Sequence, residues 1–170
     1  SVDSLAPFSP GVRRWFESSF EGATDAQAAG WKAISSGLST LICAPTGSGK
    51  TLSAFLWALD RLASEPVPEE RLRRCRVLYV SPMKALAVDV ERNLRSPLVG
   101  IRHAATRLAL PEPDITVAVR SGDTPADERR AFARSPSDVL ITTPESLFLL
   151  LTSAAREALA GVETVILDEV

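Results

Sequence analysis

The sequence predicts an α/β domain built on a parallel sheet with helices on both faces. Short apolar runs alternate with longer segments of helical periodicity, which is typical of βαβ units. The apolar runs are nearly continuous, as in strands that are buried on both sides. A chain of 170 residues with 45% hydrophobic and 24% charged residues also has the composition of one globular domain.

The first 64 residues are expected to hold three helices and one strand. Residues 10–20 and 24–36 are expected to be helices, because aromatic residues give the first an apolar side and Gly37 ends the second. Residues 40–44 form an apolar run typical of a buried strand. Residues 49–64 have apolar side chains at helical spacing and are expected to be the third helix.

A loop rich in proline and charge, residues 65–74, leads into a series of strand–helix pairs. The four arginines between positions 71 and 76 are expected to be solvated. Proline is tolerated in the first turn of a helix, so Pro97 and Pro144 are expected to begin helices. The expected strands are 75–80, 114–119, 139–142 and 165–167, and the expected helices are 84–94, 97–108, 125–133, 144–151 and 154–160.

The charge balance argues against a protein that is basic over its whole surface. Nineteen Lys and Arg residues against 21 Asp and Glu residues give a net charge of −2. Residues 61–134 nevertheless hold 14 basic and 10 acidic side chains, whereas residues 135–170 hold one and six. The positive charge in the middle of the chain therefore either binds along the phosphate backbone of a nucleic acid or lies on solvated helix faces.

The two cysteines, Cys43 and Cys75, lie in apolar runs, and neither has a CxxC partner. They are expected to be buried free thiols of a cytoplasmic protein, in a reducing compartment. No apolar run approaches the roughly 18 residues that a membrane span needs. Because the chain begins at Ser1 and stops in an acidic strand end, we expect it to be a piece of a longer protein.

The strongest functional motif is APTGSGKT, residues 44–51, between an expected strand and an expected helix. Its glycines allow the backbone to wrap a polyphosphate, and the helix N-terminus adds partial positive charge. Lys50 is expected to reach the β- and γ-phosphates of ATP, and the Thr51 hydroxyl is expected to bind Mg²⁺. The rest of the phosphate-binding loop consists of Thr46, Gly47, Ser48 and Gly49.

A second motif, VILDE, delivers two carboxylates to the end of an apolar strand. Asp168 is expected to hold Mg²⁺, and Glu169 is expected to orient the attacking water. Apolar strands often end in acidic residues, so this motif alone is a weak signal. It indicates ATP hydrolysis only together with the expected phosphate-binding loop upstream.

Gln27 has two interpretations. Thr24 and Gln27 have the T-x-x-Q spacing of a capping box, in which the two side chains cap the helix reciprocally. Alternatively, the Gln27 amide reads the edge of an adenine base.

Taken in order, APTGSGKT, SPMKAL, SGDT, TTPESL and the final DE resemble the motifs of superfamily-two DEAD/DEAH-type helicases. Longer stretches of the sequence, such as LYVSPMKALAVDVERNL and RSGDTP, resemble the large helicase-related (Lhr) family. The resemblance covers essentially the whole chain and implies the first RecA-like domain, a P-loop NTPase fold. It implies that Gln27 reads adenine, and that Lys50, Thr51, Asp168 and Glu169 have the roles given above.

The same resemblance implies that residues 1–170 end within a DExH box and that a second RecA-like domain is absent. In these helicases the second domain supplies an arginine finger, which is worth about 10³–10⁵ in rate. We therefore expect this chain alone to bind ATP weakly and to hydrolyse it poorly. Movement in the 3′-to-5′ direction is expected for the relatives.

Three further segments resemble nucleic-acid contacts, each at the end of an expected strand. They would hold the phosphates and sugars of a single strand, with DNA favoured over RNA, and would not read base sequence. The residues concerned are Pro82, Met83 and Lys84, then Ser121, Gly122 and Asp123, and finally Thr143, Pro144 and Glu145. An exposed hydroxyl is expected in the last segment.

The resulting hypothesis is an ATP-dependent helicase or translocase that uses ATP and Mg²⁺. One alternative is a module that binds ATP and single strands without turnover. Another is a phosphate-loop enzyme such as a kinase, which would show no salt-dependent binding of DNA.

Overall fold

The computed structural model describes residues 3–43 and 50–169. The chain divides into two compact units. The first contains residues 3–64, apart from 44–49, and residues 97–113. The second contains residues 65–96 and 114–169.

The first unit consists of helices around an aromatic core. Its helices are α1 (Pro10–Ser19), α2 (Asp25–Ser35), α3 (Lys50–Ser64) and the second half of α4 (Lys84–Arg107). Trp31 is fully buried, with Phe8 and Phe16 packed edge-on against it at ring-centre distances of 5.0 and 5.4 Å. The Trp31 indole N–H donates to the Ser53 carbonyl oxygen at 3.1 Å, so its polar group is also satisfied.

The strand expected at residues 40–44 is wrong for the part that the structure describes. Residues 40–43 are not in a strand, and the side chain of Leu41 is 79% exposed. A strand needs a hydrogen-bonded neighbour, and the first unit offers no other strand among its described residues. Cys43 is therefore exposed rather than buried, whereas Cys75 is buried as expected.

The two helices expected around Pro97 are a single helix, α4. A proline inside a helix removes one hydrogen bond, and sequence reasoning therefore placed a helix boundary there. Instead, α4 continues through Pro97, which is also where the chain passes between the two units. The remaining helices largely follow the expected ranges, although residues 154–159 form a 3₁₀ helix, η2 (Ala154–Leu159).

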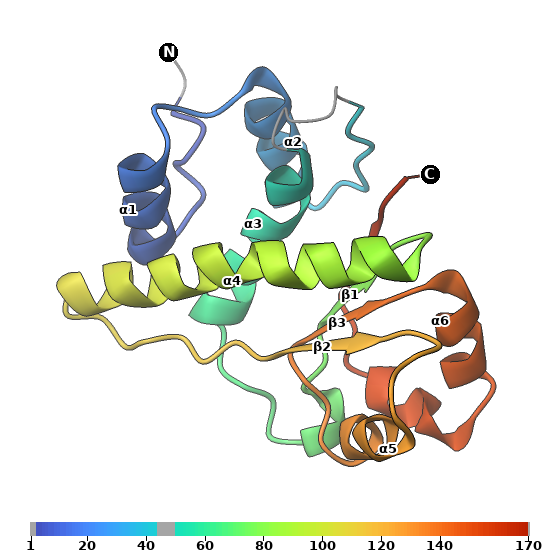
Figure 1. Cartoon of the computed structure of the whole chain (residues 1–170). Coiled ribbons are helices and arrows are strands. Elements are labelled where there is room, and N and C mark those ends of the chain that lie inside the picture. Colours follow the sequence, from blue (N-terminus) through green and yellow to red (C-terminus); the bar gives the residue numbers. More distant parts are fainter. Residues whose placement is uncertain (1–2, 44–49, 170) are drawn as a thin grey trace. The chain divides into compact units, whose positions relative to one another are not determined.

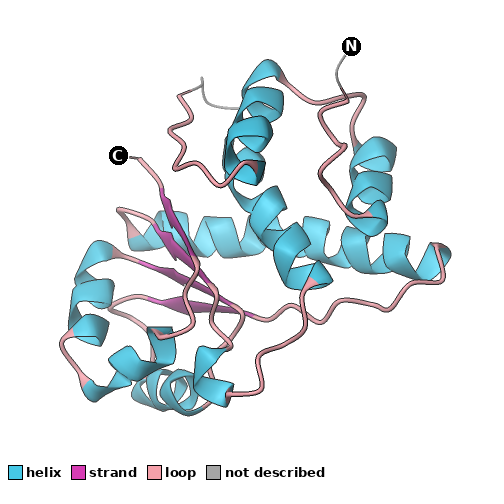
Figure 2. Ribbon diagram, turned by 180° about the vertical axis from the view of Figure 1, so that it is seen from behind, coloured by secondary structure: helices cyan, strands magenta, loops and turns pink. Residues whose placement is uncertain are grey.

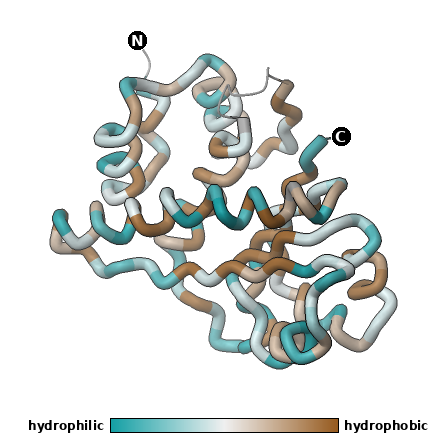
Figure 3. Tube along the Cα trace, viewed as in Figure 1, coloured by the Kyte–Doolittle hydropathy of each residue, from teal (hydrophilic) through white to brown (hydrophobic). Residues whose placement is uncertain are grey.

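The second unit contains a four-stranded parallel sheet of order β2-β3-β1-β4. Its strands are β1 (Val77–Val80), β2 (Val117–Arg120), β3 (Val139–Thr142) and β4 (Thr164–Leu167). The two central strands, β1 and β3, are completely buried, as their continuous apolar sequences predict. Figure 3 shows these strands as a hydrophobic centre within this unit.

Helices cover both faces of this sheet, which confirms the predicted α/β architecture (Figures 1 and 2). The helices α5 (Ala126–Arg134) and α6 (Pro144–Leu151) lie with η2 on one side. The first half of α4 lies on the other side. The core under α5, α6 and η2 is built from apolar side chains that include Leu78, Leu140 and Leu150.

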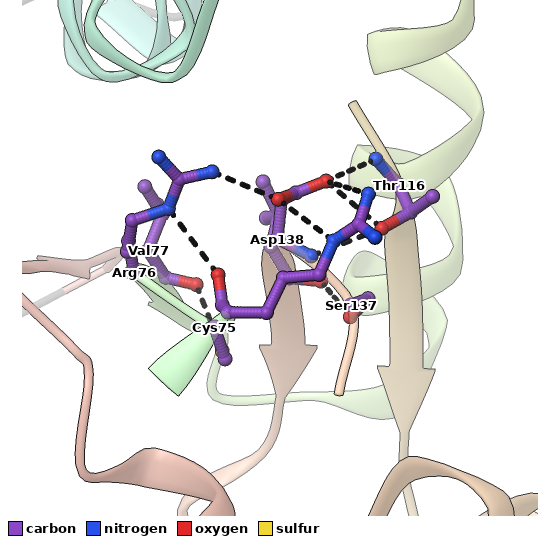
Figure 4. A network of polar contacts seen from close by, with 8 residues as sticks. Cys75, Arg76, Val77, Thr116, Ser137 and Asp138 are labelled. Atoms are coloured by element: carbon purple, nitrogen blue, oxygen red, sulfur yellow. Dashed lines mark hydrogen bonds and ion pairs between the residues drawn. The ribbon is translucent and has the colours of Figure 1, made fainter. Parts of the chain in front are cut away.

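A buried charged network joins the strands at their amino ends (Figure 4). The Asp138 side chain, 1% exposed, forms ion pairs with Arg76 at 2.9 Å and Arg74 at 3.2 Å. It also accepts hydrogen bonds from the Thr116 backbone N–H and hydroxyl, at 2.8 and 3.0 Å. The expectation that all the arginines between 71 and 76 are solvated is therefore wrong, because Arg76 is only 4% exposed.

This network also affects Cys75, which lies beside it (Figure 4). Burial, followed by the negative charge of Asp138, raises the pKa of the Cys75 thiol to about 12. Burial by itself would raise the pKa of Asp138. The hydrogen bonds from Thr116, Arg74 and Arg76 outweigh that effect and hold the pKa of this carboxyl below its usual value.

Candidate functional site

The carboxyl ends of the four strands lie at one edge of the sheet in the second unit. Parallel pairing in the order β2-β3-β1-β4 places the loops that follow these strands next to one another in the same order. Hydrogen bonds tie the ends together: Ser81 N–H donates to the Thr142 carbonyl at 2.9 Å, and Asp168 N–H donates to the Val80 carbonyl at 3.0 Å. Because ligands of open α/β sheets bind beyond this edge, it is the candidate site.

The loop after β1 and the start of α4 present three exposed residues, Pro82, Met83 and Lys84. The Lys84 ammonium lies 2.7 Å from the Asp123 carboxylate, which belongs to the loop after β2. Both side chains are more than half exposed, at 59% and 74%. Such an exposed ion pair contributes at most about 1 kcal/mol, so it joins the two loops without making Lys84 inaccessible to a ligand.

The loop after β2 is held from within and from α5. The Ser121 hydroxyl is buried and accepts a hydrogen bond from the Asp123 N–H at 3.3 Å. The Arg129 guanidinium donates to the carbonyl oxygens of Ser121 and Gly122, both at 3.2 Å. Burial, and then the positive charge of Arg129, lower the pKa of Arg120 at the end of β2. The loop is thus ordered beside two neighbouring arginines.

The exposed hydroxyl expected in the loop after β3 is wrong. The side chains of Thr143 and Ser146 are only 5% and 4% exposed. The Thr143 hydroxyl instead accepts a hydrogen bond from the Ser146 N–H at 3.3 Å and caps α6. Pro144 and Glu145, in the first turn of α6, are the exposed residues of this segment.

The two predicted carboxylates follow β4. The Tyr79 hydroxyl, on β1, donates a hydrogen bond to Asp168 Oδ2, and the Glu169 N–H donates to Asp168 Oδ1 at 3.0 Å. Glu169 has a φ of 57°, which is uncommon for a residue with a side chain. Burial, and then the hydrogen bond to Asp168, raise the pKa of Tyr79, so that its hydroxyl stays protonated and acts as a donor.

Gln27 forms the capping box that its spacing predicts. The Gln27 N–H donates to the Thr24 hydroxyl at 3.2 Å, and the Thr24 N–H donates to Gln27 Oε1 at 3.0 Å. Gln27 is 4% exposed. Capping is thereby confirmed, and the reading of adenine by the same side chain stays a prediction.

The predicted phosphate-binding residues lie largely outside the described part of the chain, since Thr46, Gly47, Ser48 and Gly49 are not described. Helix α3 begins at Lys50, and the helix was expected from residue 49. Thr51, in its first turn, is partly buried. These residues belong to the first unit, whereas Asp168 and Glu169 belong to the second.

Two residues of the site were missed by sequence reasoning. Tyr79 lies in an expected apolar strand, and Arg129 lies in an expected helix, residues 125–133. A tyrosine inside an otherwise aliphatic strand was the available signal for the first, since a buried hydroxyl needs a partner. For the second the sequence offered no signal beyond its place five residues after the SGDT turn.

Comparison with known proteins gives consistent matches. Residues 24–170 match the family described as DEAD/DEAH box helicase. The chain is 64% identical over 169 residues to a protein of Mycolicibacterium smegmatis named Lhr helicase/probable uracil glycosylase, covering 99% of this chain and 11% of that protein. It is 41% identical to the ATP-dependent helicase Lhr-Core of Methanocaldococcus jannaschii, covering 94% of this chain and 19% of that protein.

The fold also matches a solved structure, that of Mycobacterium smegmatis helicase Lhr bound to ssDNA and AMP-PNP. The TM-score is 0.92 at 62% identity, over 99% of this chain and 21% of the other. The chain therefore spans about a tenth to a fifth of the length of these relatives. None of the helices within the described ranges is long and apolar enough to cross a membrane.

Proposed function

Since the chain belongs to the DEAD/DEAH box helicase family, we propose that it carries the ATP-binding part of a motor that acts on single-stranded DNA. The observation that carries this proposal is the shared edge of the sheet. Three loops for a nucleic-acid backbone and two carboxylates for ATP hydrolysis follow adjacent strands of one sheet. A relative that is 62% identical was solved with ssDNA and AMP-PNP, which supports both ligands.

For ATP, the proposal assigns the phosphates to residues 46–51 and the adenine to Gln27. Lys50 balances the charge of the β- and γ-phosphates, and Glu169 orients the water that attacks the γ-phosphate. The protein would accelerate hydrolysis chiefly by stabilising the charge of the transition state, because phosphoryl transfer needs little covalent chemistry from the protein.

Magnesium suits the donors that the chain offers. Mg²⁺ prefers oxygen ligands and is commonly held by one or two carboxylates together with substrate phosphates and waters. Thr51 provides a hydroxyl oxygen and Asp168 a carboxylate. Within residues 3–43 and 50–169 no cluster of three or more His, Cys, Asp or Glu residues could hold a metal ion. When bound, the ion would neutralise charge on the phosphates.

For nucleic acid, Lys84 is the residue on which the proposal chiefly depends. Its exposed ammonium can pair with a phosphate in place of Asp123, because the exposed pair is weak. The buried hydroxyls of Ser121 and Thr143 shape their loops, so the contacts of those segments come from the backbone and from exposed neighbours such as Gly122 and Glu145. Backbone contacts of this kind read phosphate and sugar.

The proposal includes a partner, a second RecA-like domain of the same parent protein. An arginine finger from such a domain would stabilise the transition state, so we expect this chain alone to hydrolyse ATP slowly. The chain spans 11% and 19% of the two relatives, which leaves ample length for a second domain in proteins of that size.

The test is fluorescence polarisation of a labelled single-stranded DNA with the purified chain at several salt concentrations. Each phosphate contact contributes about 0.7 to the slope of log affinity against log salt for single strands. Lys84→Ala should weaken binding and reduce the slope by about that amount. Lys32→Ala is the matched control, because Lys32 is an exposed lysine on α2 and belongs to none of the three predicted nucleic-acid segments.

Equal effects of the two lysine variants, or DNA binding without salt dependence, would contradict the nucleic-acid part of the proposal. Binding of DNA that is unaffected by nucleotide in the parent protein would favour the non-catalytic module.

A further inference from the structure

Tyr79 is a buried polar group in the middle of an apolar strand. It is 1% exposed, and it is paired in register with Ile141 on β3 and Ile166 on β4. The hydroxyl is the feature that packing does not explain, because a buried hydroxyl costs free energy unless it is hydrogen-bonded.

The position of Tyr79 brings that hydroxyl to the end of β4. Side chains two residues apart on a strand share a face, so Asp168 follows Ile166 on the face that Tyr79 occupies. The alternating exposure along β4 agrees, since Val165 and Leu167 are exposed on the opposite face. Tyr79 and Asp168 are thus diagonal neighbours across two strands, within reach of a long aromatic side chain.

Among the residues that the structure describes, three hydrogen bonds fix Asp168. Its backbone N–H donates to the Val80 carbonyl at 3.0 Å and continues the sheet beyond β4. Its two carboxylate oxygens accept from the Tyr79 hydroxyl and from the Glu169 N–H. A carboxylate oxygen offers two lone pairs, so the contacts from the described residues leave one on each oxygen for another ligand.

We propose that Tyr79 is a positioning residue, which sets the Asp168 carboxylate in the orientation that receives the magnesium of bound nucleotide. This inference rests on the proposed function, in which Asp168 is the magnesium-binding carboxylate. The Tyr79 hydroxyl restricts rotation of the Asp168 side chain, and outer contacts that orient a metal ligand commonly matter about 10–100-fold for metal affinity or activity.

The experiment measures binding of a fluorescent ATP analogue to the purified chain as Mg²⁺ is varied, and again in EDTA. Tyr79→Phe removes only the hydroxyl. The Mg²⁺ concentration for half-maximal effect should rise about tenfold, the lower end of the range for such contacts. Binding in EDTA should stay unchanged, because the variant leaves the nucleotide contacts of the first unit intact.

A matched control removes another hydroxyl from the same sheet. The Ser137 hydroxyl donates to the Val139 carbonyl at 2.7 Å at the amino end of β3, away from Asp168. Ser137→Ala should leave the Mg²⁺ dependence unchanged. Thermal unfolding of both variants checks that the sheet is intact.

Asp168→Asn separates failure of this inference from failure of the proposed function. It should raise the Mg²⁺ requirement, and adding Tyr79→Phe to it should have no further effect, since the two residues act through one contact. If Asp168→Asn leaves the Mg²⁺ dependence unchanged, the proposed magnesium site is wrong, and the role of Tyr79 falls with it. If Asp168→Asn raises the requirement but Tyr79→Phe does not, or if Tyr79→Phe weakens binding equally in EDTA, only the inference about Tyr79 is overturned.

Discussion

Replacing Asp138 with asparagine tests the buried network at the amino ends of the strands. Asparagine has nearly the same shape, so the substitution removes the negative charge and leaves the packing. Arg76, whose side chain is 5% exposed, would then carry a buried positive charge without its counter-ion. Arg74, 29% exposed, can turn toward water and loses less.

The magnitude follows from the burial of the pair. Removing one partner of a buried ion pair costs about 3–5 kcal/mol, because the other charge stays buried and uncompensated. The asparagine oxygen can still accept one of the bonds from Thr116 or an arginine, so we expect the lower end, about 3 kcal/mol. For a chain of this size that corresponds to a fall in Tm of about 6–12 °C.

The assay compares urea unfolding of the wild type and the variant by circular dichroism. Hydrogen exchange of the β1 and β3 amides is followed in parallel, because these strands belong to the second unit, which holds the network. Asp114→Asn is the matched control. Asp114 is exposed in the same unit, so the same chemical change there should cost less than about 0.5 kcal/mol.

The pH dependence adds a second constraint. The pKa of Asp138 is lower in the folded chain than in the unfolded one, so the stability it contributes is complete above the unfolded pKa, about 3.9. That contribution is lost as the pH falls through the folded pKa. The difference between wild type and Asp138→Asn should therefore be smaller at pH 3 than at pH 7. A difference below about 1 kcal/mol at pH 7, or one that is equal at both pH values, would refute this reasoning.

Three further perturbations test other parts of the structure. Gly161→Ala should destabilise the chain by about 1–3 kcal/mol in urea unfolding, because a Cβ there would lie 2.1 Å from the backbone oxygen of Arg73. Gly122→Ala is its control, since a Cβ at Gly122 has nothing within 4 Å. Thr24→Ala should cost about 0.5–2 kcal/mol through loss of the capping box, and an unchanged urea midpoint would contradict that role. A thiol reagent should label exposed Cys43 in the native chain but reach buried Cys75 only after unfolding, and equal labelling rates would contradict the difference in burial.

The elements that were predicted correctly are indicated by sequence signals that lie within a few residues of one another. Strand β3 and helix α6 have the expected bounds, because a continuous apolar run sets the strand and a capping threonine followed by Pro144 starts the helix. The failures depend on distant partners. The apolar run at 40–43 has strand composition, but strand formation also requires a neighbour, which composition does not reveal.

The candidate site, too, was predicted where local signals sufficed and missed where distant partners decide. Lys84, Asp123 and Asp168 lie at the predicted edge of the sheet, because parallel strands bring their carboxyl ends together. Contacts between residues far apart in sequence were not predicted. The Tyr79–Asp168 hydrogen bond joins residues 89 apart, and the Arg76–Asp138 contact joins residues 62 apart. Taken alone, Tyr79 fits a residue of an apolar strand and Arg76 fits a solvated arginine, so neither indicates its distant partner.

The central claim, that this chain holds the nucleotide of a helicase motor, is tested most directly by calorimetric titration of Mg-ATP into the purified chain and into its Lys50→Ala variant. We predict measurable binding to the wild type that the substitution abolishes, while circular dichroism shows both proteins to be folded. Absence of binding to a folded wild-type chain, or equal binding to the two proteins, would contradict the claim.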